Sequence, residues 1–251
     1  MKRVLVCFLA FLLIALGAAA EGAGPDADAF RTVGNLVEFG RFEQDDDLNN
    51  GDEPLGWLVL DYDAENDRAL LISRYGLKCI QYNYLLYSTD TWDTCSIRGW
   101  LNGEFFDTAF DAAEQGAVLL TDVDNSRSQG LSGWDTDGGS DTQDRVFLLS
   151  YAEANRYLGV EHYMVSGSIH NVKARLAPTP SCIYSGLVVD KYKTEEGRSS
   201  GWWWLRSPGR SQGDTAVVSY HGALISHESY RGMGMIRPAV WVDLTAGYFA
   251  R

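Results

Sequence analysis

Three consecutive tryptophans, Trp202 to Trp204, constrain the folding of this chain more than any other feature. They lie in the segment GWWWLRSPG (Gly201–Gly209), and a second apolar segment, IRPAVWVDL (Ile236–Leu244), follows near the C-terminal end. Each indole ring carries a large apolar area that is costly to leave in water. Both segments are therefore expected to be core strands. Because side chains alternate along a strand, Trp202 and Trp204 share the face opposite Trp203, and one of them is expected to reach a ligand.

Two arginines, Arg206 and Arg237, lie within these apolar segments. A charge beside a hydrophobic core needs a partner, and a guanidinium finds one in a buried carboxylate or in backbone carbonyl groups. Anion binding is the alternative role for both arginines. Because they alternate with core residues, we expect structural roles for Trp203, Arg206, Arg237 and Trp241.

The N-terminal residues have the three parts of a secretory signal peptide. Lys2 and Arg3 precede an apolar run from Val4 to Leu16, and Ala18–Ala20 then supply a small-residue cleavage site. The run is shorter than the roughly 20 residues that a membrane-spanning helix needs. We therefore expect residues 1–20 to be cleaved and the protein to be exported, either secreted or held in the cell envelope, without membrane insertion.

The charge of the chain excludes two classes of partner. It has 21 basic and 34 acidic residues, and loss of Lys2 and Arg3 with the signal peptide moves the net charge from -13 to -15. Nucleic acid and anionic membranes repel so acidic a protein. Hydrophobic residues make up 45% of the full sequence, enough for a sizeable core. We expect a disordered leader over residues 21–32 and a single domain over residues 33–246.

Apolar periodicity predicts the first elements of that domain. Short alternating runs at Val37–Phe39, Trp57–Leu60 and Ala69–Ser73, separated by polar turns, predict an antiparallel meander. Between Asp93 and Gln115 the apolar residues recur at steps of three and four, which predicts an amphipathic helix broken near Asn102–Gly103.

The second half of the chain alternates structure with loops. Arg145–Leu149 reads as a strand, and Ser150 with Glu153 predicts a capping box for a helix over Tyr151–Tyr157. The weak pattern from Leu158 to Ser200 predicts mostly loop. Strands are then expected at Trp202–Leu205, Thr215–Ser219, Ala223–Ser226 and Met235–Leu244.

Several segments in fixed order resemble a known family. They are FGRFEQ, GDEPLGWLVLD, CSIRGWLNGEFFDTAF, DRVFLLSYAEANRYL, WWWLRSPG and IRPAVWVDL, and they extend from about Val37 to Leu244. The set resembles a family of uncharacterised exported bacterial domains known only as a domain of unknown function. That family in turn is similar to the C-type-lectin-like superfamily, in the branch of the formylglycine-generating (sulfatase-modifying) domains and the variable proteins of diversity-generating retroelements.

The resemblance implies an α+β fold, with two main helices packed on short antiparallel sheets and with extensive loops that form a ligand face. Trp203–Ser207 and Met235–Val242 match the strands that form the central sheet in that superfamily. The resemblance implies no agreed activity.

The chain departs from the enzymes of the superfamily. The formylglycine-generating enzymes use a close cysteine pair near the C-terminus to bind copper, and no cysteine follows Cys182 here. The related iron enzymes need three histidines, whereas His162, His170, His221 and His227 are scattered over expected loops. The G-x-S-x-G spacing occurs at Gly197–Gly201 and at Gly209–Gly213, but an expected strand follows each, whereas a nucleophile elbow leads into a helix. We therefore name no catalytic residue and keep an enzyme on the same scaffold, a hydrolase or a sulfatase-modifying one, as the alternative.

Calcium is the only cofactor that the sequence suggests. Asp135, Asp137 and Asp141 surround a Gly-Gly turn in WDTDGGSDTQD, where alternate carboxylates can face one hard cation. The alternative is a solvated acidic turn, because Asp and Gly favour turns for geometric reasons. The run Asp45, Asp47 and Asn49 is a weaker candidate of the same kind.

The mature chain keeps three cysteines, Cys79, Cys95 and Cys182. An odd number in an exported protein permits at most one disulfide and leaves one thiol. The sequence does not decide which pair, if any, forms.

Aromatic residues in expected loops are the remaining candidates for function. Binding faces over-use aromatic residues and arginine. The candidate ligand-binding residues are Trp134, Asp135, Trp202, Tyr220, His221, Tyr230 and Arg231, in or near the loops Thr121–Asp144 and Ser219–Gly234. We expect an exported, non-enzymatic binding domain that recognises a glycan or the surface of an extracellular protein. A structural module of the cell envelope is the third possibility.

Overall fold

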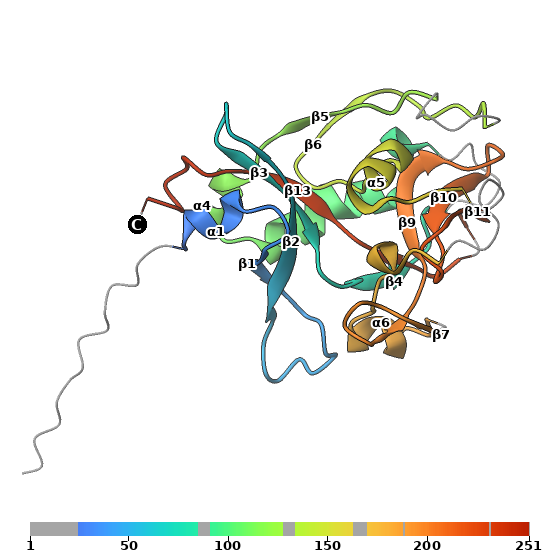
Figure 1. The fold of residues 1–251 in the computed structure, drawn as a ribbon, viewed down its shortest axis with the longest axis horizontal. Coiled ribbons are helices and arrows are strands. Elements are labelled where there is room, and N and C mark those ends of the chain that lie inside the picture. Colours follow the sequence, from blue (N-terminus) through green and yellow to red (C-terminus); the bar gives the residue numbers. More distant parts are fainter. Residues whose placement is uncertain are drawn as a thin grey trace, which may run out of the picture.

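The computed structural model describes residues 25–84, 91–127, 134–162, 170–187, 189–230 and 232–250. Its architecture is α+β, as expected, and consists mostly of strands with short helices between them. Figure 1 shows the strands with the short helices packed around them. The signal peptide expected over residues 1–20 lies outside the described residues.

The first sheet has four antiparallel strands in the order β1-β2-β3-β13. They are β1 (Leu36–Phe42), β2 (Glu53–Asp63), β3 (Arg68–Ser73) and β13 (Ala239–Asp243). The meander expected from the alternating runs is confirmed. Trp57, fully buried in β2, lies opposite Val37 and donates its indole N–H to the carbonyl oxygen of Phe39 over 2.6 Å, so this large buried side chain has its polar atom satisfied.

The second sheet has five strands in the order β11-β10-β9-β12-β4. They are β4 (Lys78–Ile80), β9 (Trp203–Pro208), β10 (Asp214–Val218), β11 (Leu224–Glu228) and β12 (Gly234–Ile236). β12 runs parallel to β9, with Met235 opposite Trp203, and the other pairs are antiparallel. The tryptophan segment is therefore the middle of this sheet, as expected.

The strand expected over Met235–Leu244 is two strands that belong to different sheets. β12 ends at Ile236 and pairs in the second sheet, whereas β13 begins at Ala239 and pairs with β3 in the first. Pro238 has no N–H to donate to a ladder, so pairing breaks where it stands. Arg237 consequently lies at the junction between the two sheets.

The helical region expected between Asp93 and Gln115 is confirmed, including its break. It consists of η1 (Trp92–Thr94), α2 (Ser96–Trp100), a wide turn η2 (Leu101–Phe105), α3 (Phe106–Ala109) and α4 (Ala112–Ala117). Gly103 has non-helical angles, φ -118° and ψ -107°, and separates the two halves. The helix α5 (Tyr151–Leu158) has the expected capping box between Ser150 and Glu153.

The remaining elements are short. They are η3 (Val172–Ala174), α6 (Pro180–Tyr184), the ribbon of β5 (Thr121–Val123) with β6 (Thr142–Asp144), and the pair β7 (Asp190–Lys193) and β8 (Ser199–Ser200). The strand expected at Arg145–Leu149 is wrong: the segment makes only an isolated bridge from Phe147 to Ala239. Its apolar run is instead explained by burial, because Val146 to Leu149 are all enclosed in the core.

The disordered leader expected over residues 21–32 is wrong for its last part. The helix α1 (Ala27–Arg31) is ordered, and Phe30 is 2% exposed and packs edge-on against Phe249 with ring centroids 5.0 Å apart. Arg31 binds Asp67 in the turn before β3 through Nη2 and the carboxylate at 2.7 Å. A single phenylalanine and one ion pair therefore fix a segment whose composition is otherwise typical of disorder.

The core is continuous around the two sheets, and the residues predicted to be structural lie in or against it. Trp203 is fully buried, and Arg206 and Arg237 are 5% and 4% exposed. Trp241 is half-buried and packs under the guanidinium of Arg68, 4.9 Å from its ring centroid. No helix among the described residues has the length and hydropathy of a membrane span.

Candidate functional site

The loop expected over Thr121–Asp144 is partly ordered by the β5–β6 ribbon, in which Thr121 pairs with Asp144. Trp134 is half-buried, and its ring meets that of His162 edge-on at 5.4 Å. Thr136 is buried and donates its hydroxyl to the carbonyl oxygen of Gly209 over 2.7 Å. This hydrogen bond connects the loop to the residue that follows β9. Residues 128–133 lie outside the described residues.

The three carboxylates expected to bind calcium do not converge on one point, because each has another partner. Asp141 accepts the backbone N–H of Asn125 over 2.8 Å, and Asp137 accepts that of Gly139 over 3.1 Å. Asp135 and Asp137 both approach Arg127, at 3.4 and 3.7 Å. A turn held by its own acidic side chains is the geometry that the alternative interpretation predicted.

Within the described part of the chain, the carboxylates that do converge are Glu43, Asp45 and Glu53, with ligand atoms within 4.8 Å of one another. Their oxygens accept backbone N–H groups of the same loop: Glu43 from Asp45 and Asp46, and Glu53 from Gln44. A backbone hydrogen bond from Asp47 is the main reason why the pKa of Asp45 is lowered. These contacts explain the cluster as loop structure.

The residues Tyr220 and His221, predicted as ligand-binding, lie in the turn between β10 and β11 and meet two rings that the sequence did not single out. Tyr192 of β7 stacks with Tyr220 at 5.9 Å and 15°, and the ring of His221 lies 4.1 Å from that of Tyr192. His170 also stacks with Tyr192, at 5.5 Å and 29°. We call these four residues the tyrosine–histidine cluster.

A buried serine and a glycine in a turn fix the backbone segments that carry this cluster. The hydroxyl of Ser200, a fully buried residue, lies 3.0 Å from the carbonyl oxygen of Tyr192 and 2.9 Å from that of Tyr220, so one donor ties the two tyrosine segments together. The turn after Tyr220 needs Gly222, because its φ is +86° and a Cβ there would strike the carbonyl oxygen of Asn171.

The cluster is half-exposed and carries little charge of its own. His170 is exposed, and Tyr192, Tyr220 and His221 are half-buried. Burial, followed by the neighbouring His170, lowers the pKa of His221, so its imidazole is neutral at pH 7. Arg175 and Lys191 supply adjacent cations, with the guanidinium 5.3 Å and the amine 5.7 Å from the ring of Tyr192.

Trp202 forms a second aromatic contact on the same sheet. Its ring stacks on His227 at 4.7 Å and 11° and meets Trp204 edge-on at 4.8 Å. Trp202 is half-buried, whereas Trp204 is fully buried and donates its indole N–H to the carbonyl oxygen of Ile80. The expectation that Trp204 can also reach a ligand is wrong, because Trp202 and Tyr82 cover it.

Two predicted residues remain, Tyr230 and Arg231. Tyr230 is half-buried, and its carbonyl oxygen accepts the side-chain amide of Gln81. Arg231 lies outside the described residues. The other predicted ligand-binding residues separate into three groups, around Trp134, around Tyr220 and around Trp202.

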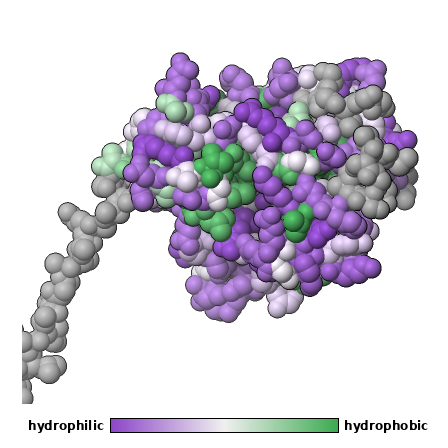
Figure 2. Space-filling model, viewed as in Figure 1, coloured by the Kyte–Doolittle hydropathy of each residue, from purple (hydrophilic) through white to green (hydrophobic). Residues whose placement is uncertain are grey.

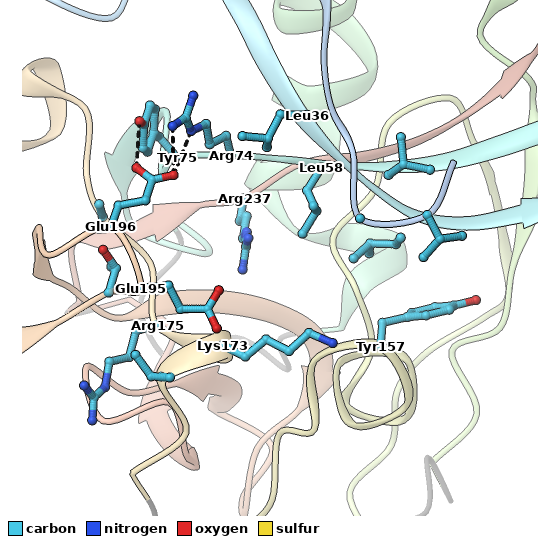
Figure 3. Close-up of a pocket in the computed structure, with 17 residues that line it drawn as sticks. Leu36, Leu58, Arg74, Tyr75, Tyr157, Lys173, Arg175, Glu195, Glu196 and Arg237 are labelled. Atoms are coloured by element: carbon cyan, nitrogen blue, oxygen red, sulfur yellow. Dashed lines mark hydrogen bonds and ion pairs between the residues drawn. The ribbon is translucent and has the colours of Figure 1, made fainter. Parts of the chain in front are cut away.

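A pocket that the sequence did not indicate lies between the first sheet and the segment before α6. Figure 3 shows its lining, which comes from β1 and β2, from η3 and the residues after it, and from the turn between β7 and β8. The volume is about 400 Å³, toward the lower end of the range for small-molecule sites, about 300–1,000 Å³. Arg237, at the junction of the two sheets, belongs to the lining.

The two buried arginines each have one buried nitrogen without a hydrogen-bond partner, Nε of Arg206 and Nη1 of Arg237, but only Arg206 pairs with a carboxylate. Arg206 donates to the carboxylate of Glu153 and to the carbonyl oxygen of Leu148, so its structural role has the expected partner. Arg237 donates Nε to the carbonyl oxygen of Ser73 over 3.0 Å and stacks over Trp203, but its Nη1 is buried with no hydrogen-bond partner. The sequence shows both as an arginine in an apolar strand, so it could not separate them.

The comparisons with known proteins give one match. A family model described as a domain of unknown function (DUF6273) matches residues 66–244, which extend from the turn before β3 to the end of β13. The match includes α5, the tyrosine–histidine cluster and Arg237. No curated protein and no solved structure matches the chain.

Proposed function

This chain belongs to the family described as domain of unknown function (DUF6273), and we propose that it is an exported binding protein that recognises a glycan through the tyrosine–histidine cluster. The observation that carries the proposal is the nearly parallel arrangement of Tyr192 and Tyr220, at 15°, on two segments fastened by one serine. The rings are thus half-exposed and held in place before any ligand arrives.

The chemistry of the cluster suits a neutral polyhydroxylated ligand. The face of an aromatic ring attracts the weakly positive C–H groups of an apolar surface, and tyrosine hydroxyls and imidazole nitrogens donate or accept hydrogen bonds beside it. A neutral His221 adds polarity without charge. Rings that are already ordered lose little side-chain entropy on binding, which favours affinity.

The proposal assigns no chemical step to these residues. The imidazole of His221 lies against tyrosine rings and His170, so the cluster offers π faces and hydroxyl groups. Export rests on the N-terminal Lys2–Ala20 pattern, and mass spectrometry of the secreted protein tests it by the position of the mature N-terminus.

The C-type-lectin-like assignment is part of the same proposal. It is supported by the pairing of β9 with β12 in the second sheet, because the two segments that match the superfamily's central strands are neighbours there. It is also supported by the return of the C-terminal β13 to the sheet of the N-terminal strands. An experimental structure compared with members of that superfamily tests the assignment.

A glycan array probed with the secreted protein tests the binding function. We expect binding to one class of neutral glycan, reduced about tenfold or more by Tyr220→Ala and by Tyr192→Ala. Tyr220→Phe separates the ring from the hydroxyl, and we expect it to keep most of the affinity. Tyr184→Ala is the matched control, because Tyr184 is 72% exposed on α6 and outside the cluster.

Two outcomes of the array would contradict the proposal. Binding that is unchanged in both alanine variants places the glycan elsewhere, at Trp134 or Trp202. A uniformly blank array removes the glycan and leaves the surface of an extracellular protein as the ligand class to test.

A further inference from the structure

The pocket beside Arg237 combines an apolar wall with positive charge. Figure 2 shows an apolar patch on this face of the molecule, in the region where Figure 1 places β1 and β2. Val33 and Leu36, which line the pocket, are 59% and 51% exposed. Exposed apolar side chains at the mouth of a concave site are more often found where a ligand covers them than on open surface.

Arg237 is the polar group at the inner end of this pocket. It is 4% exposed, and only its Nε has a hydrogen-bond acceptor among the described residues, the carbonyl oxygen of Ser73. Nη1 is buried and unpaired. Figure 3 shows the guanidinium pointing into the pocket, toward the side on which Lys173 and Glu195 lie. An unpaired buried charged donor is costly, and an acceptor that enters the pocket removes that cost.

Burial lowers the pKa of Arg237 to about 10, because the low-dielectric surroundings disfavour its charged form. Arg237 is still protonated at pH 7. It therefore holds a positive charge at physiological pH in a place where the fold provides no counterion among the described residues. Because the surroundings have a low dielectric, the attraction between the guanidinium and a bound anion is strong. This attraction offsets the cost of burying the charge in the apo protein.

The other charged residues of the pocket leave a positive excess. Arg74 is neutralised by Glu196 at 2.9 Å. Arg175 points away from the cavity and donates to the carbonyl oxygen of Lys193 over 2.7 Å. The groups that face the cavity beside Arg237 are then Lys173 and Glu195, both exposed. Two cations and one carboxylate meet in this pocket although the chain as a whole carries a net charge of -13.

The walls define the rest of the ligand. Leu36 and Leu58 come from the first sheet, Val172 and Ala177 from the opposite segment, and Tyr157 closes one end. A cavity of about 400 Å³ accommodates one ring or a short branched chain and excludes an extended polymer.

From this geometry we propose that the pocket is a binding site for a small monocarboxylate with an apolar body, whose carboxylate pairs with Arg237 and whose body lies against Leu36 and Leu58. Guanidinium and carboxylate match as a planar pair, which a single inward-facing arginine can satisfy. Lys173 adds the second contact from the rim. The site is separate from the tyrosine–histidine cluster and does not depend on the glycan proposal.

Thermal unfolding of the exported full-length protein tests the site, with benzoate as the probe and benzamide as the neutral control of the same shape. We expect benzoate to raise the melting temperature in a saturable way and benzamide to leave it unchanged. Acetate, which lacks the apolar body, is expected to bind at least tenfold more weakly than benzoate. Inorganic phosphate tests whether the pocket prefers a phosphate to a carboxylate.

Variants test whether the shift in melting temperature comes from binding in this pocket. Arg237→Gln is expected to abolish the benzoate shift. If this variant fails to fold, the two rim residues still decide, since both are exposed: Lys173→Gln is expected to weaken binding about threefold and Glu195→Gln to strengthen it about threefold, because they remove charges of opposite sign. Arg68→Gln, outside the pocket, is the matched control and keeps the wild-type response.

Three results would overturn the inference. Equal shifts with benzoate and benzamide mean that the charge is not recognised, and a larger shift with phosphate means that the anion class is wrong. Changes of the same sign in the Lys173 and Glu195 variants mean that the anion does not lie between them. Tyr220→Ala is expected to keep the benzoate response, so loss of glycan binding and loss of carboxylate binding are distinguishable.

Discussion

Glu153 joins the helix α5 to the strand β9, because its two carboxylate oxygens accept both Nη atoms of the buried Arg206. The same carboxylate accepts the backbone N–H of Ser150 over 2.7 Å and thereby closes the capping box of α5. One side chain thus satisfies a helix terminus and a buried cation together. Removing the carboxylate leaves the N–H of Ser150 without its acceptor and leaves Arg206 with backbone carbonyl groups but no counterion.

Glu153→Gln is therefore expected to lower the free energy of unfolding by about 3 kcal/mol, because it strands the charge of Arg206 in the core. Urea denaturation measures the loss. Glu65→Gln is the matched control, since Glu65 is exposed in a turn, and we expect it to change the stability by less than about 0.5 kcal/mol. A Glu153 variant as stable as this control would mean that Arg206 is satisfied by backbone carbonyl groups alone.

Arg237 is buried to the same extent as Arg206, but we expect its replacement to have little effect on the free energy of unfolding. It has no carboxylate to strand, and burial lowers its pKa to about 10, so the charge itself costs stability below that pH. Arg237→Gln is expected to change the free energy of unfolding of the apo protein by less than about 1 kcal/mol, in either direction. Arg206→Gln in parallel is expected to cost about 3 kcal/mol. Equal losses in the two variants would contradict the assignment of Arg237 to a ligand.

The parts of the fold that sequence could predict are those set by local patterns. The S-x-x-E spacing of Ser150 and Glu153 identifies the start of α5, and the alternation around Trp57 identifies the first meander, because both depend on residues close in the chain. The contact between Glu153 and Arg206 joins residues 53 positions apart, and no local period encodes it.

The candidate sites were less predictable for the same reason. Tyr220 and His221 are recognisable as loop aromatics, but their partners Tyr192 and His170 arrive from segments that read as featureless loop. The pocket needs three segments that only the fold brings together. Arg237 could be assigned only once its surroundings were known, because a paired and an unpaired arginine look alike in a sequence.

Gly234 leaves room for the ring of Trp202 to pack against the second sheet. A Cβ at this position would strike the ring of Trp202 and come within 2.6 Å of Nε1 of Trp204. Trp204 is fully buried, so Trp202 must move. Gly234→Ala is expected to lower the free energy of unfolding by about 1–3 kcal/mol and to increase quenching of tryptophan fluorescence by acrylamide. Gly247→Ala, with open space around its Cβ, is the control. Unchanged quenching in Gly234→Ala would show that the ring does not pack as described.

The attachment of α1 is expected to depend on pH through Asp67. Its hydrogen bond with Arg31 is the main cause that lowers the pKa of Asp67, so the folded protein binds fewer protons than the unfolded chain in acid. The stabilisation is complete above the ordinary pKa of about 3.9 and is lost as the pH falls through the lower folded value.

Asp67→Asn should remove this part of the acid sensitivity and expose α1 to proteases already at pH 7. Asparagine tolerates the positive φ of residue 67, 46°, so the backbone is not strained by the change. Limited proteolysis between pH 7 and about pH 3 measures how readily α1 is cleaved. Cleavage near α1 that does not change with pH or with the substitution would contradict the role of the pair.

The three cysteines that the structure describes are closed off from solvent. Cys79, Cys95 and Cys182 are each at most 4% exposed and free. Burial raises the pKa of Cys95 to about 12, and a hydrogen bond with Cys182 together with burial raises that of Cys79, so neither forms the reactive thiolate at neutral pH. An aromatic disulfide reagent at pH 8 is expected to modify none of the three in the folded protein within the time that it needs to modify all three in urea. Rapid reaction of one thiol without denaturant would show that its segment opens in the native state.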